Sequence, residues 1–251
     1  MKLAIKFKTN DFILCWDSGT GHRLQRYPAY KENRAPAALS EEEKADRRER
    51  VLQGSRLTTR VIPNLGFRNS FIQPGFEADD ILAYWANKLK DKGTRVIMIT
   101  NDSDMYQCLN DCSIYNPTTK KSFTKVDFIK KYNVKPEQWA MAKAIGGCSG
   151  DNVEGIEGVG DPKSQSSKAL KYIRGELTSG RIYERIENGE FIINRNLQLV
   201  ALPYQDIPLT RMIRKRNKYN RRGFLQTFDK YHFISFLKTD SFIKWERAFL
   251  Q

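Results

Sequence analysis

The stretch Val96–Asp104, Val-Ile-Met-Ile-Thr-Asn-Asp-Ser-Asp, constrains the fold of this 251-residue chain more than any other. Its four apolar residues are typical of a buried strand in a parallel sheet. Asp102 and Asp104 follow directly, and open α/β sheets bind their ligands at the carboxyl ends of the strands. The sequence therefore predicts an acidic ligand site at one edge of an α/β sheet.

Neighbouring segments predict the rest of that sheet. The apolar run Phe12–Trp16 predicts a second strand, which ends at Asp17, and residues 113–116 predict a further one. An apolar stripe at helical spacing over residues 81–90 predicts a helix, and a strand–helix–strand order implies a right-handed parallel crossover. Residues 1–9 fit either a helix or a strand. More helices are expected over residues 125–132, 136–146, 164–174, 182–188 and 191–202.

The composition changes near Gly146, where a polar, glycine-rich loop begins. We expect an α/β core over residues 1–140 and a helical region over residues 141–251. Ser40 followed by three glutamates is typical of a helix N-terminus. The helix it opens, Leu39–Arg60, is basic and has few apolar residues, so it should be poorly buried and mobile.

The chain carries 43 Lys and Arg against 29 Asp and Glu, a formal net charge of +14. This excess favours a polyanion as partner, either nucleic acid or an anionic membrane surface. No apolar run approaches the roughly 20 residues that span a bilayer, and no clear membrane-binding helix or signal peptide is visible. We expect a soluble, intracellular protein that binds nucleic acid and no membrane; a merely basic protein is the alternative.

The four cysteines are scattered along the chain. Cys108 and Cys112 are four residues apart, but no second Cys or His pair completes a zinc site. We expect Cys15, Cys108, Cys112 and Cys148 to be free, largely buried thiols.

Acidic residues form four groups, each after a strand, at a helix start or in a glycine-rich loop: Asp17; Glu77, Asp79 and Asp80; Asp102 and Asp104; and Asp151. Clustered carboxylates need cations, and oxygen ligands without histidine favour Mg²⁺ or Mn²⁺ over zinc. Two such ions about 4 Å apart can activate a water and stabilise the leaving oxygen of a phosphodiester. Each group alone also fits a helix-dipole, turn or cap residue.

Glycines in Gly155–Gly160 are spaced to expose backbone amides and carbonyls at a helix start. Such a loop can bind a phosphate or a monovalent cation. The basic residues between Arg211 and Arg222 either help to hold a duplex or form a solvated helix face.

Four motifs together resemble the 5′–3′ exonuclease and flap endonuclease family, which includes phage 5′-nucleases and the 5′-nuclease domain of bacterial DNA polymerase I. They are Tyr27–Arg34, Glu77–Asp80, Thr100–Asp104 and Gly150–Gly160. The resemblance covers about residues 12–170. It implies a PIN-like α/β core with a mostly parallel sheet, a helical arch at about residues 35–60, and a helix–three-turn–helix region that binds duplex backbone.

The resemblance also implies roles for individual residues. Asp17, Glu77, Asp79 and Asp80 match acids around a first metal ion, and Asp102, Asp104 and Asp151 match acids around a second. Lys31 and Arg34 match basic residues that engage the scissile phosphate. The DNA-binding set would be Tyr30, Lys31, Arg34, Arg47, Arg48, Gly155, Gly158, Gly160, Lys163 and Lys168. The implied cofactors are two Mg²⁺ or Mn²⁺ ions, with K⁺ at the glycine-rich loop.

Two departures from the family stand out. Its first strand, which ends in an aspartate, has no counterpart before Asp17, so a separate polypeptide would supply it or the sequence is truncated. Phage relatives also carry an acid three residues before the counterpart of Asp151, where this chain has Cys148. A soft thiol is a poor Mg²⁺ ligand.

The leading hypothesis is a Mg²⁺-dependent structure-specific 5′-nuclease, a monomer in the cytoplasm of a bacterial or phage-infected cell. It would act on DNA with 5′ flaps or 5′ ends, or on RNA–DNA. The alternative is a weakened or inactive member that binds branched DNA. A third reading, phosphoryl transfer through an aspartate nucleophile in Asp102–Asp104, leaves the arch and the glycine-rich loop unexplained.

Overall fold

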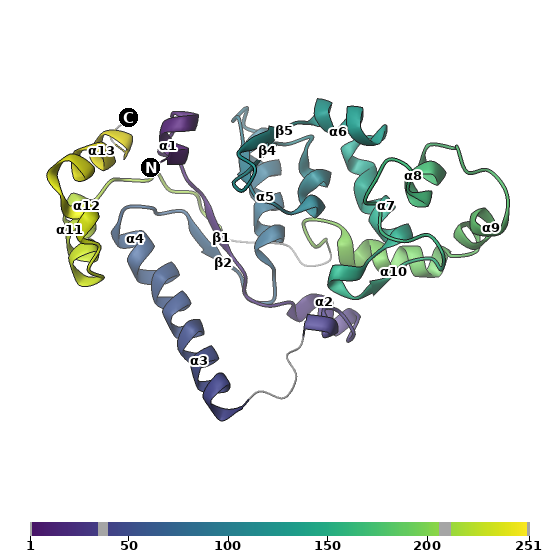
Figure 1. Ribbon diagram of the computed structural model, residues 1–251, viewed down its shortest axis with the longest axis horizontal. Helices are drawn as coiled ribbons and strands as arrows, with labels where there is room; N and C mark the ends of the chain where they lie inside the picture. The colour runs from purple at the N-terminus through teal and green to yellow at the C-terminus, as the bar shows by residue number, and fades with distance from the viewer. Residues whose placement is uncertain (1, 35–39, 206–211, 250–251) are drawn as a thin grey trace. The chain divides into compact units, whose positions relative to one another are not determined.

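The computed structural model describes residues 2–34, 40–205 and 212–249 (Figure 1). The chain forms two compact units from interleaved segments. The first unit comprises Met1–Trp16, Pro36–Ile72 and Thr210–Gln251, and the second comprises Asp17–Ala35 and Gln73–Leu209. The boundary expected near residue 140 falls inside the second unit, and the division into a nuclease core and a DNA-binding region stays a prediction.

The second unit contains a three-stranded sheet of β3 (Ile97–Ile99), β4 (Ser113–Asn116) and β5 (Lys121–Phe123). Strands β3 and β4 are parallel, with Met98 opposite Ile114, and β5 adds to β4 in the antiparallel direction. Met98 and Ile114 are both buried, as expected for a strand that is covered by helices. The strands predicted over residues 96–99 and 113–116 are confirmed, whereas β5 is not predicted by the sequence patterns.

Helices cover this sheet. Helix α5 (Ala78–Lys90) buries Ile81, Trp85 and Leu89, the stripe expected from their spacing. Helix α6 (Lys125–Tyr132) begins after Thr124, whose side chain accepts a hydrogen bond from the Asp127 backbone N–H. A 3₁₀ turn, η4 (Pro136–Gln138), leads into α7 (Trp139–Gly146). The main core includes Met98, Met105, Ile114, Phe128, Trp139, Ile145 and Leu170.

The rest of the second unit contains short helices and one hairpin, joined by loops. Helices α8 (Lys168–Ile173), α9 (Arg181–Glu187) and α10 (Glu190–Val200) confirm the three helices predicted there. Strands β6 (Gly147–Cys148) and β7 (Val153–Glu154) pair antiparallel around the 3₁₀ turn η5 (Ser149–Asp151). Three short helical segments complete the unit: α2 (Gly21–Arg26), η1 (Glu32–Arg34) and η3 (Ser103–Cys108).

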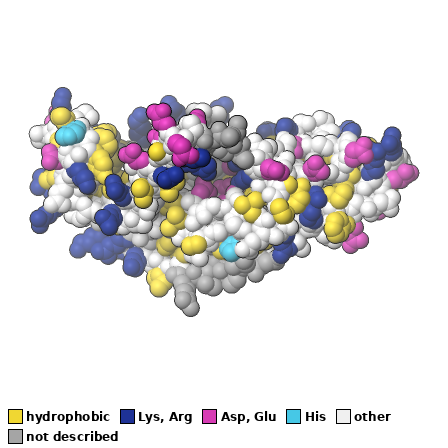
Figure 2. Space-filling view, turned by 90° about the horizontal axis from the view of Figure 1, so that it is seen from below, with side chains coloured by type: hydrophobic (Ala, Val, Ile, Leu, Met, Phe, Trp, Pro, Cys, Tyr) yellow, Lys and Arg dark blue, Asp and Glu magenta, His cyan; other side chains and the backbone are white. Residues whose placement is uncertain are grey.

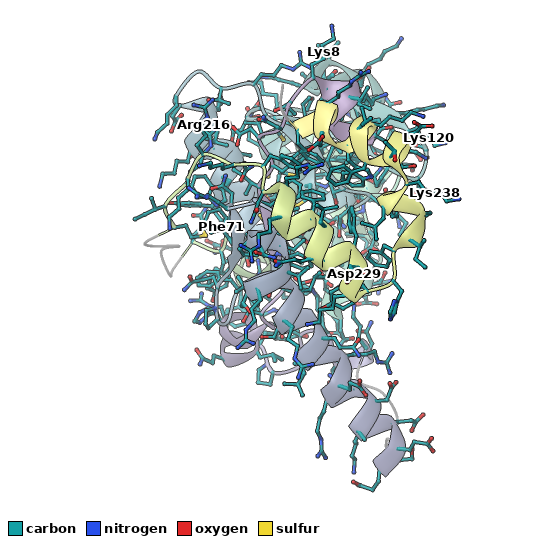
Figure 3. All side chains as sticks on the ribbon, turned by 90° about the vertical axis from the view of Figure 1, so that its left-hand side faces the viewer. Lys8, Phe71, Lys120, Arg216, Asp229 and Lys238 are labelled. Carbon is teal, nitrogen blue, oxygen red and sulfur yellow. The ribbon has the colours of Figure 1, made fainter. Side chains whose placement is uncertain are left out.

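In the first unit, β1 (Leu14–Trp16) pairs parallel with β2 (Ser70–Ile72). Its helices are α1 (Lys2–Phe7), α3 (Glu41–Arg56), η2 (Leu57–Val61), α4 (Ile62–Asn64), α11 (Arg221–Lys230), α12 (Ile234–Leu237) and α13 (Thr239–Phe249). Figure 3 shows Asp229 near the end of α11 and Lys238 between α12 and α13.

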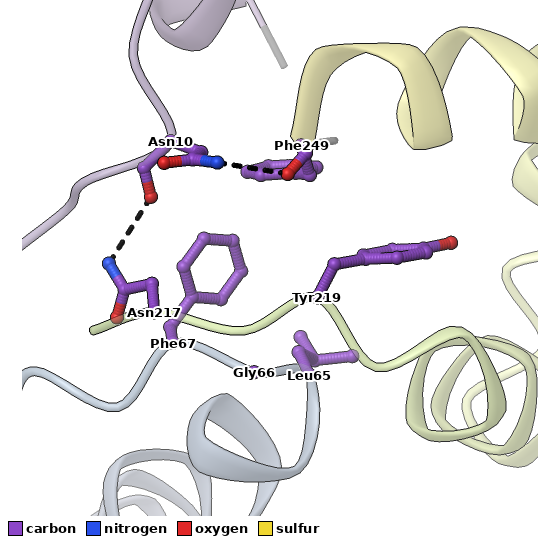
Figure 4. Close-up of a pocket in the computed structure, with 7 residues that line it drawn as sticks. All are labelled: Asn10, Leu65, Gly66, Phe67, Asn217, Tyr219 and Phe249. Carbon is purple, nitrogen blue, oxygen red and sulfur yellow. Dashed lines mark hydrogen bonds between the residues drawn. The ribbon is translucent and has the colours of Figure 1, made fainter. Parts of the chain in front are cut away.

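An aromatic core around Phe224, Phe228 and Phe249 holds the first unit together. The Asn10 side chain donates a hydrogen bond to the Phe249 carbonyl at 3.1 Å, and Asn217 donates one to the Asn10 carbonyl at 3.2 Å (Figure 4). These contacts join segments from the two ends of the chain. The hollow that they border holds only about 10 Å³, too little for a ligand.

Helix α3 confirms the predicted cap. The Ser40 side chain accepts from the Glu43 backbone N–H, and the Glu43 carboxylate accepts from the Ser40 N–H. No residue of α3 is buried, as expected, and Leu39 lies outside the described residues.

Lys and Arg side chains are prominent at the left of the space-filling view (Figure 2). In the part of the chain that the structure describes, no helix is long and apolar enough to cross a membrane.

The fold class is therefore α/β with helices around small sheets, as the sequence predicts. The expected sheet is realised in the described residues as separate short ladders, β1–β2, β3–β4–β5 and β6–β7.

Candidate functional site

A cavity of about 550 Å³ in the second unit gathers acidic side chains that lie far apart in the sequence. It is lined by six of the seven predicted acids: Asp17, Glu77, Asp79, Asp102, Asp104 and Asp151. Lys31 and Arg34 line it as well. The seventh acid, Asp80, is not among the lining residues.

The start of α5 positions the first acid group, which we define as Asp17, Glu77 and Asp79. Glu77 is the N-cap of the helix, and Asp17 Oδ1 accepts a hydrogen bond from the Ala78 backbone N–H at 2.7 Å. Unpaired N–H groups and the helix dipole favour negative charge at this end. The N-terminus of α5 therefore orders these carboxylates at the cavity.

Asp80 is fully buried and pairs with Arg23. The Arg23 guanidinium donates to both oxygens of Asp80, at 2.6 and 2.8 Å, and its Nε donates to the Leu199 carbonyl at 2.8 Å. The Tyr204 backbone N–H donates to Asp80 Oδ1 at 2.8 Å. Arg23 and Asp80 are 2% and 0% exposed. Asp80 thus anchors Arg23, and this geometry gives no support to Asp80 as a metal ligand.

The basic segment over residues 30–34 lies against both acid groups. The Tyr30 hydroxyl donates to Glu77 Oε2 at 2.9 Å, and Lys31 Nζ pairs with Glu77 and lies 3.6 Å from Asp151 Oδ1. Arg34 Nη2 lies 2.7 Å from Asp151 Oδ1. Lys31 has a left-handed backbone (φ 55°), held by its N–H bond to the Asp151 carbonyl at 2.8 Å. A non-glycine residue in that conformation is strained, a feature common at functional sites.

The second acid group is Asp102, Asp104 and Asp151. Asp102 is the N-cap of η3 and accepts a hydrogen bond from the Asp104 N–H at 2.8 Å. Asp104 Oδ1 lies 2.7 Å from the buried Lys143 Nζ. Cys148 Sγ lies 4.0 Å from Asp104 Oδ2 and 3.5 Å from Asp151 Oδ2. Two carboxylates, a thiol and an ammonium therefore share one side of the cavity.

Crowded negative charge perturbs the acids. Burial raises the pKa of Asp79 to about 7, and the carboxylates of Asp102, Glu77 and Asp17 contribute in the same direction. Lys31 opposes this shift but does not cancel it, so positive charge only partly compensates the Asp79 carboxyl.

In the second acid group the pKa of Asp104 is also perturbed, and Lys143 partly compensates the effect. Burial raises the pKa of Asp104, although Lys143 opposes the shift. Burial lowers the pKa of Lys143, but the Asp104 carboxylate and Cys148 outweigh it, so that pKa is raised overall. Burial also raises the pKa of the Cys148 thiol to about 12.

The donor set fits divalent cations. Carboxylate oxygens of the first group suit hard ions such as Mg²⁺ or Mn²⁺. Ligand atoms of Asp104, Cys148 and Asp151 all lie within 4.8 Å of one another, close enough for one ion. A cation at either position would offset the burial and the carboxylate repulsion that together raise the pKa of Asp79 and of Asp104.

Three charged lining residues were not among the predicted site residues: Arg23, Lys143 and Asp161. The Asp161 carboxylate accepts from the Ser149 hydroxyl at 2.8 Å and lies 3.6 Å from Lys163 Nζ. A lysine within the apolar run of α7 is an unusual pattern that could have indicated Lys143. Arg23 carries no such signal, because its partner Asp80 lies 57 residues away.

The glycine-rich loop packs closely at the hairpin. A Cβ on Gly155 would lie 2.3 Å from the Gly146 carbonyl carbon, so only glycine fits there. Gly155, Gly160 and Lys163 line a second hollow of about 430 Å³. The Lys168 ammonium donates to the Gly158 carbonyl. The predicted DNA-binding residues Tyr30, Lys31, Arg34 and Lys163 line the main cavity, whereas Arg47 and Arg48 are exposed on α3 in the other unit.

Comparison with known proteins gives a consistent result. A family model described as 5′–3′ exonuclease, N-terminal resolvase-like domain, matches residues 1–133. DNA polymerase I of Mycobacterium tuberculosis is 31% identical over 201 residues, which cover 74% of this chain and 21% of that protein. A 5′–3′ exonuclease of Aquifex aeolicus is 41% identical over 100 residues, covering 39% of this chain and 34% of that protein. The chain thus spans about a fifth of the length of the polymerase relatives.

Solved structures of bacteriophage T5 proteins are also similar. The T5 5′-exonuclease with bound divalent metal ions (zinc) matches with a TM-score of 0.66 and 29% identity, over 80% of this chain and 78% of that chain. A T5 flap endonuclease in a pseudo-enzyme–product complex with DNA and metal ions matches with a TM-score of 0.62 and 29% identity, over the same shares.

Proposed function

Because this chain belongs to the 5′–3′ exonuclease family, we propose that it is a divalent-metal-dependent nuclease that hydrolyses phosphodiester bonds at 5′ ends or 5′ flaps of DNA. The observation that carries this proposal is the convergence of six carboxylates with Lys31 and Arg34 in one cavity of the second unit. Acids of this density beside basic side chains suit a metal ion and a phosphate together.

The first acid group would hold Mg²⁺ through carboxylate oxygens of Asp17, Glu77 and Asp79, and the second group would hold a second divalent ion. When bound, such ions lower the pKa of water and offset charge on the leaving oxygen. The hydrogen-bonded pair of Arg23 and Asp80 holds the start of α5 in place. This arrangement fixes the carboxylates before substrate arrives, so little reorganisation is needed during reaction.

Lys31 and Arg34 would contact the scissile phosphate. Lys31 pairs with Glu77, and Arg34, whose side chain is 57% exposed, pairs with Asp151. Once metal ions neutralise these carboxylates, the two cations can turn to phosphate oxygens. Their charge then stabilises the extra negative charge that develops on the phosphorus oxygens in the transition state.

Cleavage of a 5′-flap DNA with and without Mg²⁺ tests the proposal. We expect Asp79→Asn to lower the rate by at least about 10²-fold, in the range for loss of a preorganised electrostatic group. Asp91→Asn is the matched control, because Asp91 lies at the exposed C-terminal end of the same helix. Unchanged cleavage by Asp79→Asn would contradict the proposal.

A second candidate is a family member that binds branched DNA without cutting it. The ion pair between Lys143 and Asp104 favours it, because the ammonium already neutralises one carboxylate of the second group. It predicts salt-sensitive DNA binding and no cleavage with Mg²⁺, Mn²⁺, Co²⁺ or Zn²⁺. Action on RNA–DNA, K⁺ at the glycine-rich loop, a separately supplied first strand and a monomeric state stay predictions.

A further inference from the structure

Cys148 differs from the other cysteines in its surroundings. All four lie within the described residues, and Cys148 is the one that lines the acidic cavity. It is 7% exposed, and its Sγ lies near one oxygen of Asp104 and one of Asp151. Cys108, by contrast, is packed in the main hydrophobic core.

The backbone around Cys148 fixes the direction of its side chain. Cys148 pairs with Val153 across the β6–β7 hairpin, and Gly147 before it has a φ of +85°. Gly155 lies directly against the Gly146 backbone and leaves no room there for a Cβ. The turn η5 then brings Asp151 back toward the thiol. The thiol and the two carboxylates are thus held together by a short, closely packed segment.

This donor set selects a different ion from the first acid group. Mg²⁺ demands oxygen ligands in near-ideal octahedral geometry, whereas thiolate sulfur favours Zn²⁺ and other borderline ions. We propose that Asp104, Cys148 and Asp151 hold one sulfur-accepting divalent ion, of the Zn²⁺ or Co²⁺ class, through one thiolate and two carboxylates. The inference rests on the proposed metal dependence of the nuclease and assigns its second ion a distinct chemistry.

The charges balance in this arrangement. On binding, the S–H bond of Cys148 breaks, a sulfur–metal bond forms, and the proton passes to solvent without a change in oxidation state. One thiolate and two carboxylates then carry three negative charges. A divalent ion and the Lys143 ammonium, which lies 2.7 Å from Asp104 Oδ1 and 3.8 Å from Cys148 Sγ, carry three positive charges.

A structural role is the alternative. Cys148 also packs in a cluster with Tyr30, Ala144, Val153, Leu199 and Val200, where a small apolar side chain is suitable. Packing alone predicts that replacing the thiol leaves the choice of metal unchanged. The two readings therefore differ in a property that can be measured without substrate.

Titration of the metal-free 251-residue chain with Co²⁺ tests the proposal, because cobalt bound to sulfur gives a thiolate-to-cobalt charge-transfer absorption. We expect this absorption in the wild type and in Cys112→Ser, and its loss in Cys148→Asp and Cys148→Ser. Cys112→Ser is a matched control, since the Cys112 thiol donates to the Cys108 carbonyl outside the cavity and a serine hydroxyl can do the same. Using two replacements guards against a single variant that fails to fold.

Calorimetric titration with Zn²⁺ and Mg²⁺ measures the metal preference directly. In Cys148→Asp, the ratio of Zn²⁺ to Mg²⁺ affinity should fall by at least roughly tenfold, since even outer partners of metal ligands change affinity by that much. Cobalt binding by the wild type without the charge-transfer absorption, or an unchanged affinity ratio, overturns the inference. If the absorption appears but no metal supports DNA cleavage, the proposed function fails while the sulfur-containing site stands.

Discussion

Arg23 and Asp80 form a buried, bidentate ion pair, with Nη1 and Nη2 at 2.6 and 2.8 Å from the two carboxylate oxygens. Burial lowers the pKa of Arg23, but the hydrogen bonds and charge of Asp80 outweigh it and raise the pKa. The pair joins α2 to the start of α5 and, through the Leu199 carbonyl, to the end of α10. It therefore ties together three segments that border the cavity.

Replacing Arg23 with methionine should leave Asp80 as an uncompensated buried charge. We expect the free energy of unfolding to fall by about 3–5 kcal/mol, the usual cost of breaking a buried pair from one side. Urea denaturation measures this change. Arg26→Met, on the exposed side of the same helix, should cost no more than about 0.5 kcal/mol. Equal losses in the two variants would contradict a supporting role for the pair.

Metal affinity should depend on the ionisation of Asp79. Its pKa is raised to about 7, so the proton must leave before the carboxylate can bind a cation. We expect the Mg²⁺ affinity to fall as the pH is lowered from about 8 through 7, and this dependence to disappear in Asp79→Asn. Calorimetry across that pH range would show it. A Mg²⁺ affinity that does not change with pH would exclude Asp79 as a ligand.

The same shift predicts how the stability of the metal-free protein changes with pH. The folded-state pKa lies above the ordinary value of 3.8, so the stabilising contribution of Asp79 is complete below that value and is lost as the pH rises through 7. The melting temperature of the wild type should therefore fall relative to Asp79→Asn over this interval. Added divalent metal should reverse the loss. A difference in melting temperature between the two proteins that stays the same at every pH would contradict this prediction.

Arg34→Ala should slow DNA cleavage by roughly 10²–10³-fold, as does removal of one group that stabilises transition-state charge. Binding of the flap DNA in the absence of cleavage should change far less, because most phosphate contacts remain. Single-turnover kinetics and a binding titration separate these effects. Arg181→Ala, at an exposed position outside the cavity, is the control. Loss of binding with an unchanged cleavage rate would place Arg34 outside the reaction centre.

Gly155→Ala should destabilise the hairpin, because the new Cβ would lie 2.3 Å from the Gly146 backbone, which cannot yield as a flexible side chain would. We expect a loss of about 1–3 kcal/mol, typical of overpacking, together with weaker metal binding at Cys148 and Asp151. Gly54→Ala is the contrasting variant: its Cβ on α3 would meet no atom within 4 Å. That change should stabilise the helix by about 0.5–1 kcal/mol, as chemical denaturation can determine.

Local patterns predict those elements whose signals lie within the element itself. Helix α6 follows from its Thr124 cap and apolar spacing, and β4 from a short run of apolar and aromatic residues. Strand β2 is only three residues long, and its partner β1 lies more than fifty residues earlier, so pairing depends on tertiary contacts. Strand β5 likewise depends on its pairing with β4, so its own residues do not predict it.

The candidate site also has residues that local patterns predict and residues that depend on tertiary contacts. Six of the predicted acids line one cavity, and each of them follows a strand, opens a helix or lies in the glycine-rich loop. Asp79 and Asp80 are neighbours in the sequence, yet one lines the cavity and the other pairs with Arg23. Which of them lines the cavity depends on the rotation of α5 about its axis. Contacts of Asp80 with Arg23 and Tyr204, from distant segments, set that rotation.

Helix α3 contributes no buried side chain, and its N-terminus is held by its own capping residues. Substitutions along it carry little penalty for the rest of the molecule as long as the segment remains helical. The sequence of this segment is therefore constrained by its own cap and by helix propensity, and not by packing against a core.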